Sequence, residues 1–130
     1  MRKFALGIIL LCVSALLLSA CGGKSNDPAS RAVEDYLTAL VNKDATKLSG
    51  LACADWESSA LLELDSLQAV KTRLDGLSCK TTGTVGTTSQ VDCQGKILAT
   101  YNGEDQALDL SARTYQVVQQ GGEYLVCGYK

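Results

Sequence analysis

The sequence predicts an α+β domain in which N-terminal helices pack on one face of a curved, four-stranded antiparallel sheet. Apolar residues recur at helical spacing from Ala29 to Leu74, and after Gly76 the apolar period changes to two. Short connections, most of them containing glycine, separate the segments of period two, which favours an antiparallel meander. A run of helices followed by a run of strands is typical of an α+β fold.

Three helices are expected in the first half of the domain. Each begins at an aspartate whose side chain can accept hydrogen bonds from the free N–H groups of the first turn: Asp27, Asp44 and Asp55. Pro28 strengthens the first of these signals, because proline suits the first helical position. The second helix is short and ends near Gly50. The third carries apolar residues as far as Leu74, so that Gly76 is its expected C-terminal cap.

Four strands are expected after Gly76, over residues 77–82, 91–101, 107–119 and 123–129. Their connections are a Gly/Thr loop at residues 83–88, a hairpin turn at residues 102–105 and the pair Gly121–Gly122. These connections are short enough to join neighbouring antiparallel strands. The sheet is expected to bend into a cone over the helices.

The first 21 residues carry an export signal. Arg2 and Lys3 precede an apolar run of 15 residues, Phe4–Leu18, which is shorter than the ~20 residues that a transmembrane helix needs. The following Leu18–Cys21 resembles the lipobox of bacterial lipoproteins. By this resemblance residues 1–20 are a cleaved signal peptide, Cys21 carries a lipid anchor, residues 21–27 form the tether and residues 28–130 the folded domain. The expected location is the extracytoplasmic face of a membrane in the cell envelope.

The composition excludes several classes of function. Without Arg2 and Lys3, ten Lys and Arg face 14 Asp and Glu, which disfavours nucleic acid and anionic lipid headgroups as partners. The chain has no histidine, so it lacks the commonest general base and metal ligand. No cofactor and no metal are expected.

Four cysteines remain after the signal and the lipidated residue. An even number in a small exported domain predicts two disulfides, whereas a zinc site would need a CxxC pair or histidines that the sequence lacks. Three pairings of Cys53, Cys79, Cys93 and Cys127 are possible, and sequence alone does not choose among them. If residues 85–87 centre the first hairpin, Cys79 faces Cys93 and Cys53 pairs with Cys127.

Several segments resemble the NTF2-like superfamily of cystatin-like α+β folds. They are Ala32–Leu40 (AVEDYLTAL), Lys43–Asp44 and Leu48–Leu51 at the start of the domain, and Gly121–Val126 at its end. The resemblance implies a cone-shaped cup. It also implies one of two kinds of protein, because the superfamily contains isomerases and dehydratases that use a pocket Asp or His with Tyr, as well as binding modules without chemistry.

A candidate pocket follows from the third strand. Asp109, Ser111, Arg113 and Tyr115 share one of its faces and could line a cup suited to a small polar or anionic ligand. The alternative is an exposed strand face with an Asp109–Arg113 ion pair. Trp56 lies on the apolar stripe of its helix, where it either stacks on a ligand or belongs to the core.

Three classes of function remain. The favoured hypothesis is a membrane-anchored, non-catalytic module that binds a small molecule or an envelope protein. The second is an NTF2-like enzyme of the isomerase or dehydratase type, with Asp92 or Asp109 acting beside a tyrosine; exposure of both aspartates to solvent would remove it. The third, a protease inhibitor, needs an apolar hairpin wedge, and the candidate loops are polar.

Overall fold

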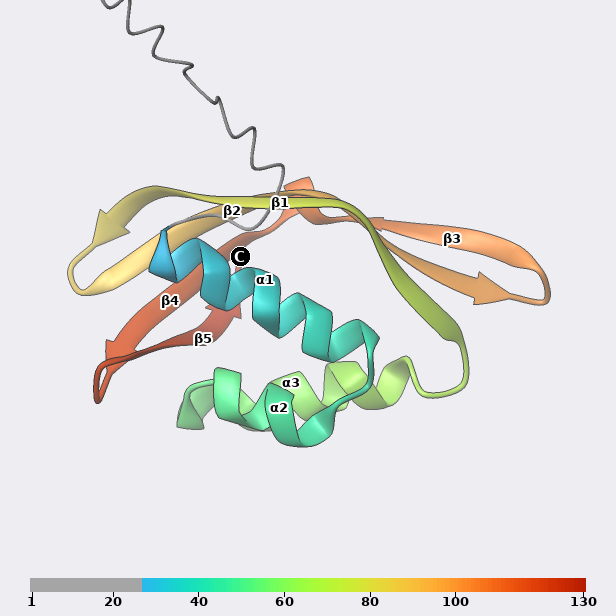
Figure 1. Cartoon of the computed structure of the whole chain (residues 1–130), viewed down its shortest axis with the longest axis horizontal. Helices are drawn as coiled ribbons and strands as arrows, with labels where there is room; N and C mark the ends of the chain where they lie inside the picture. Colours follow the sequence, from blue (N-terminus) through green and yellow to red (C-terminus); the bar gives the residue numbers. More distant parts are fainter. Residues whose placement is uncertain (1–26) are drawn as a thin grey trace, which may run out of the picture.

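The computed structural model describes residues 27–130, so the expected signal peptide, Cys21 and residues 22–26 of the tether lie outside the described residues. Three helices precede five strands: α1 (Pro28–Val41), α2 (Ala45–Leu51), α3 (Ala54–Ser66), β1 (Lys71–Val85), β2 (Thr88–Tyr101), β3 (Glu104–Asp109), the 3₁₀ turn η1 (Leu110–Ala112), β4 (Thr114–Gln120) and β5 (Glu123–Tyr129). Figure 1 shows α1 against the sheet and α2 and α3 on the other side of α1. The α+β class is confirmed. None of the helices in the described part is long and apolar enough to cross a membrane.

The first two helices begin where the sequence predicts. The Asp27 side chain accepts from the Ala29 N–H, and the Asp44 side chain accepts from the Lys47 N–H at 3.0 Å. The chain leaves α1 through Lys43, whose φ of 59° lies in the left-handed region. The Lys43 ammonium then donates to the Val70 carbonyl and holds the end of the helical half against the start of the sheet.

The third helix is shorter than expected, and the prediction for residues 67–76 was wrong. Helix α3 begins after Cys53 rather than at Asp55 and ends at Ser66, and β1 already begins at Lys71. Residues 71–75 pair with residues 96–100 of β2, so backbone pairing replaces the helical hydrogen bonds that the apolar spacing suggested. Gly76 does not cap a helix. It occupies a β-bulge at φ 66°, in close contact with Gly95.

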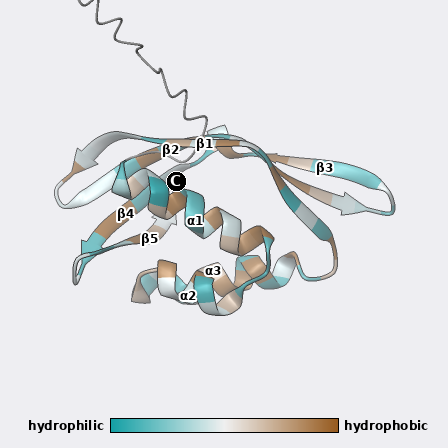
Figure 2. Ribbon diagram, in the orientation of Figure 1, coloured by the Kyte–Doolittle hydropathy of each residue, from teal (hydrophilic) through white to brown (hydrophobic). Residues whose placement is uncertain are grey.

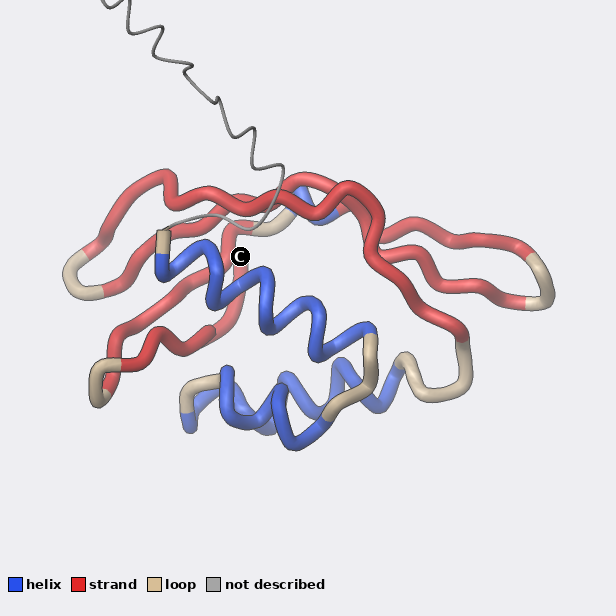
Figure 3. The backbone as a smooth tube through the Cα atoms, viewed as in Figure 1, coloured by secondary structure: helices blue, strands red, loops and turns tan. Residues whose placement is uncertain are grey.

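The sheet has five strands where four were expected. Its order is β1-β2-β4-β5, and β3 pairs with the second half of β2 while β4 pairs with the first half. The expected third strand, residues 107–119, is interrupted by η1. Asp109 caps this turn by accepting from the Ser111 N–H, and Leu110 turns fully into the core. Figure 3 shows the short helical turn between the two strands.

The core lies between α1 and the inner face of the sheet. Val33, Tyr36, Leu37 and Leu40 on α1 are fully buried, which confirms the predicted apolar stripe. Polar and apolar residues alternate along α1 in Figure 2, as expected for a helix with one buried face. The sheet contributes residues that project from its inner face: Val91, Ile97, Tyr115, Val117 and Val126.

Both disulfides join the cysteines that the hairpin geometry predicts. Cys79 and Cys93 face each other in the register of β1 and β2, and their sulfurs are bonded. Cys53 is bonded to Cys127 and ties the start of α3 to β5. The Cys53 N–H also donates to the Val126 carbonyl at 2.9 Å. The helical half is therefore fixed to the last strand by a covalent bond and a hydrogen bond.

Candidate functional site

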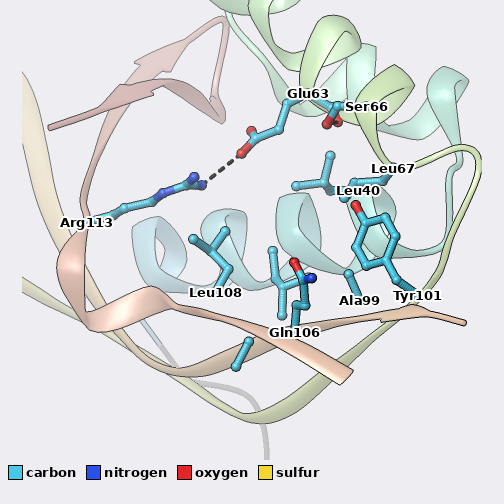
Figure 4. A pocket seen from close by; sticks show the side chains of 11 residues that line it. Leu40, Glu63, Ser66, Leu67, Ala99, Tyr101, Gln106, Leu108 and Arg113 are labelled. Carbon is cyan, nitrogen blue, oxygen red and sulfur yellow. Dashed lines mark hydrogen bonds and ion pairs between the residues drawn. The ribbon is translucent and has the colours of Figure 1, made fainter. Parts of the chain in front are cut away.

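A cavity of about 340 Å³ opens between the C-terminal end of α3 and the part of the sheet where β2 pairs with β3. Figure 4 shows its lining, which comes from α1, α3, β2, β3 and the residue after η1. Most of the lining is apolar: Leu40, Leu67, Ile97, Ala99, Ala107 and Leu108. Five residues add polar groups: Glu63, Ser66, Tyr101, Gln106 and Arg113. A cavity of this size and character suits a small molecule with a mainly apolar body.

An ion pair forms one wall of the cavity. The Arg113 guanidinium donates to Glu63 Oε1 at 2.8 Å (Figure 4). Both side chains are less than a fifth exposed. Glu63 comes from α3, whereas Arg113 follows η1 directly. The 3₁₀ turn therefore decides which way Arg113 points, because a continuous strand would have carried its side chain in a different direction.

Four aromatic side chains, which we call the aromatic cluster, lie behind this ion pair: Tyr36, Trp56, Tyr115 and Tyr129. The Arg113 guanidinium lies 4.0 Å from the centre of the Tyr129 ring, a cation–π contact. Trp56 and Tyr115 each meet the Tyr129 ring edge-on at 5.5 Å. The Trp56 Nε1–H donates to the Tyr36 hydroxyl at 3.0 Å, so the indole has its hydrogen-bond partner.

The cluster shifts the titration of its members. Burial raises the pKa of Tyr36, Tyr115 and Tyr129, so each phenol is held in its neutral form. The Arg113 charge acts in the opposite direction on Tyr115 but does not reverse the increase. Burial also works against the charge of Arg113, but its contacts with Tyr115 and Glu63 outweigh this effect and raise its pKa.

Two buried oxygens have no hydrogen-bond partner among the described residues. One is Oε2 of Glu63, the carboxylate oxygen that does not bind Arg113, and the other is the Tyr115 hydroxyl. The Tyr115 hydroxyl lies close to the guanidinium, but the two do not reach hydrogen-bond geometry. A buried acceptor without a partner costs about 1–3 kcal/mol. A donor that reached Glu63 Oε2 would remove this cost, and the Tyr129 hydroxyl is the nearby protein group that interacts with the Glu63 carboxylate.

The sequence-predicted pocket residues lie in three different places. Arg113 lines the cavity, while Tyr115 and Trp56 lie behind it in the aromatic cluster. Asp109 is exposed and caps η1, so it does not share a face with the others, and the predicted Asp109–Arg113 ion pair does not form. The extended strand that was expected to place them together is broken by η1.

Asp92, the other acid considered for catalysis, is exposed on the outer face of the sheet. Its Oδ1 accepts from the Thr114 hydroxyl at 2.7 Å, and Asp92 is not among the residues that line the cavity. It lines a separate hollow with Ser78, Lys80, Thr82 and Gln94, none of which is a tyrosine. Within residues 27–130 no group of three His, Cys, Asp or Glu side chains could hold a metal ion.

Glu63 was missed, although the sequence contains a signal for it. On α3 it lies three residues after Ala60 and four before Leu67, so an acid interrupts the apolar stripe of the helix. Ala60 is buried and Leu67 packs against the core, which carries Glu63 inward with them. A charged residue within an apolar stripe implies a buried partner.

Comparison with solved structures gives the fold a name. An NTF2-like protein with a cystatin-like fold from Novosphingobium aromaticivorans is 13% identical and matches with a TM-score of 0.54, covering 78% of this chain and 77% of its own. The chain has an NTF2-like fold. This confirms the fold expected from the resemblance. No family model and no curated protein match the sequence.

Two further structural neighbours are proposed dehydratases, the first of them from the NTF2-like family. One, from Streptomyces avermitilis, is 14% identical with a TM-score of 0.50 and covers 75% of this chain and 88% of its own. The other, a proposed scytalone dehydratase from N. aromaticivorans, is 15% identical with a TM-score of 0.52 and covers 78% of each chain. At these identities the likeness concerns the fold alone.

Proposed function

We propose that this chain is an exported, lipid-anchored NTF2-like module that binds a small, largely apolar molecule without transforming it. The observation that supports the binding role most directly is the mainly apolar cavity whose wall includes Glu63, a paired carboxylate with one buried oxygen that has no hydrogen-bond partner. The ligand that fits has an apolar body and one N–H or O–H group that donates to Glu63 Oε2. Because Arg113 already neutralises Glu63, the ligand needs no charge of its own.

The proposed location outside the cytosol rests on a sequence motif. Leu18–Cys21 and the apolar run before it support cleavage and lipid attachment at Cys21. The two disulfides agree with an oxidising compartment outside the cytosol. Both features are independent of the cavity, so the lipid anchor and the ligand site are two proposals that can be tested separately.

Binding is favoured over catalysis by the surroundings of the acidic residues. An NTF2-like enzyme with a pocket Asp beside a Tyr does not fit this chain, because Asp92 and Asp109 are exposed and the hollow that Asp92 lines has no tyrosine. Glu63, the acid in the cavity lining, is paired with Arg113. A carboxylate held in an ion pair by a permanently charged guanidinium is a weak general base.

A ligand screen with one substitution tests the binding site. Small alcohols, amines and amides with apolar bodies are screened for an increase in melting temperature. Each compound that binds is then measured against Glu63→Gln, which keeps the shape of the side chain and removes its charge. We expect Kd to rise about tenfold, since a hydrogen bond to a charged acceptor is stronger than one to a neutral acceptor.

Asp109→Asn is the matched control for this screen, because it removes an exposed carboxylate that lies outside the cavity lining. Its Kd is expected to equal that of the unmodified protein. Equal effects of the two substitutions, or no binding by any compound of these classes, would refute the ligand site. The anchor is tested by mass spectrometry of the mature N-terminus, where an intact Met1 or an unmodified Cys21 would contradict it.

A further inference from the structure

One wall of the cavity is a line of side chains on β2. Ile97, Ala99 and Tyr101 lie two residues apart, so they project from the same face of the strand, and all three line the cavity. At the rise of a β-strand, about 3.4 Å per residue, this line is about 14 Å long. The cavity therefore extends along β2.

The cavity opens to solvent toward Tyr101. Ile97 is 3% exposed, Ala99 is half-buried and Tyr101 is 43% exposed. Leu108, which pairs with Ile97 from β3, is 40% exposed, so that apolar side chains continue from the interior to the surface. Four large apolar side chains in the described part of the chain are exposed, and two of them line this cavity. A bound apolar chain would cover this surface.

The ion pair lies at the other end of the cavity. Arg113 directly follows η1, which interrupts the sheet just beyond the pairing of Ile97 with Leu108. Figure 4 shows Arg113 and Tyr101 at opposite sides of the cavity. Glu63 and Arg113 are less than a fifth exposed. The charged groups therefore lie at one end, and the apolar surface reaches solvent at the other.

No charged side chain belongs to the exposed part of the lining. The lining residues that are exposed have neutral side chains: Ser66, Tyr101, Gln106, Ala107 and Leu108. Glu104, which pairs with Tyr101, is exposed and lies outside the lining. Its carboxylate would repel an anionic group that emerged at this end. An uncharged chain therefore suits the open end.

We propose that the ligand is an uncharged, linear amphiphile, such as a long-chain alcohol, whose hydroxyl lies at Glu63 and whose chain extends along β2 to Tyr101. This proposal rests on the binding site proposed above and names the class of its ligand. Each methylene that the cavity removes from water strengthens binding about fourfold. A linear ligand gains this contribution along the whole line from Ile97 to Tyr101.

A series of straight-chain alcohols tests the class of ligand. Kd is measured by titration calorimetry for n-butanol, n-hexanol, n-octanol and n-decanol. The full chain carries Cys21→Ser, so that no acyl chain on Cys21 competes for the cavity. We expect Kd to fall about fourfold for each added methylene until the alcohol reaches Tyr101, and then to level off. Glu63→Gln should raise Kd about tenfold for every alcohol that binds.

Two variants test the path along β2. Ala99→Leu places a larger side chain midway between Ile97 and Tyr101, so the ratio of the Kd values of n-butanol and n-decanol should fall toward one. Ala54→Leu is the matched control, because Ala54 is exposed at the start of α3 and lies outside the lining. This variant should reproduce the whole series of the Cys21→Ser chain.

The series distinguishes the class of ligand from the binding site itself. Binding of n-butanol that weakens in Glu63→Gln, with no gain for the longer alcohols, would overturn the linear ligand and leave the site in place. A gain that persists in Ala99→Leu would also overturn the linear ligand, because the chain would not follow β2. If no alcohol bound, or if Glu63→Gln had no effect, the site would be refuted and the class of ligand with it.

Discussion

Replacing Arg113 by methionine leaves the Glu63 carboxylate buried without its partner. The Arg113 nitrogen lies 2.8 Å from the Glu63 oxygen. The centres of the two delocalised charges are farther apart, and two unit charges about 4 Å apart attract each other by about 4 kcal/mol at an effective dielectric constant near 20. Desolvation of both ions cancels much of this attraction while the pair is intact. Removal of the cation alone is more costly, because Glu63 Oε2 already lacks a partner, and we expect a loss of about 3 kcal/mol in the free energy of unfolding.

A double-mutant cycle separates the ion pair from the packing of the two side chains. Arg113→Met, Glu63→Gln and the double variant are unfolded with urea and followed by the fluorescence of Trp56, the single tryptophan, which contacts the Tyr129 ring. The double variant should be more stable than the sum of the single changes predicts, with a coupling of about 2 kcal/mol. The slope of the unfolding transition should stay constant.

The chain provides its own control for this cycle. Arg73 and Asp105 form an ion pair of similar length, 2.7 Å, but their side chains are 55% and 42% exposed. Water and salt screen such a pair, so its coupling should lie near the limit of measurement. If both cycles gave the same coupling energy, burial would not decide the strength of these pairs, and the account of the cavity wall would be wrong.

Three further predictions concern stability. Loss of the Cys53–Cys127 bond, which spans 74 residues, should lower the free energy of unfolding in urea by about 4 kcal/mol. Loss of the Cys79–Cys93 bond, which spans 14 residues, should lower it by about 3 kcal/mol. The opposite order would contradict the loop-entropy argument. Gly95→Ala should cost about 2 kcal/mol or more, because its Cβ would lie 2.6 Å from two backbone oxygens, whereas Gly50→Ala in α2 has open space and should not destabilise. The contribution of the tyrosines to stability should be complete below about pH 9, because unfolded tyrosine has a pKa of about 10. At higher pH the free energy of unfolding should fall by up to about 1.4 kcal/mol per pH unit for each fully buried tyrosine of the aromatic cluster. A stability unchanged between pH 9 and pH 11 would refute this.

Local signals in the sequence predicted most of the elements. Asp27 and Asp44 cap their helices as expected, because a cap depends on residues within one turn. The Cys79–Cys93 pairing followed from the position of the hairpin connection, since the register of a hairpin is set by its turn. The candidate site was predicted less well. Arg113 was found, but its partner Glu63 lies 50 residues away on another element.

The amino-acid sequence by itself determined the α+β class, the order of helices before strands, the number of disulfides but not their pairing, and the acidic balance that disfavours nucleic acid. These properties follow from periodicity, turn chemistry and composition, which act over a few residues at a time. The tertiary structure decided that α3 ends at Ser66, that η1 divides the third expected strand, and that Asp109 faces solvent while Arg113 faces Glu63. In each case several local conformations were compatible with the residues. Contacts between distant segments selected one of them, because a buried backbone group or charge is stable only where the fold supplies its partner.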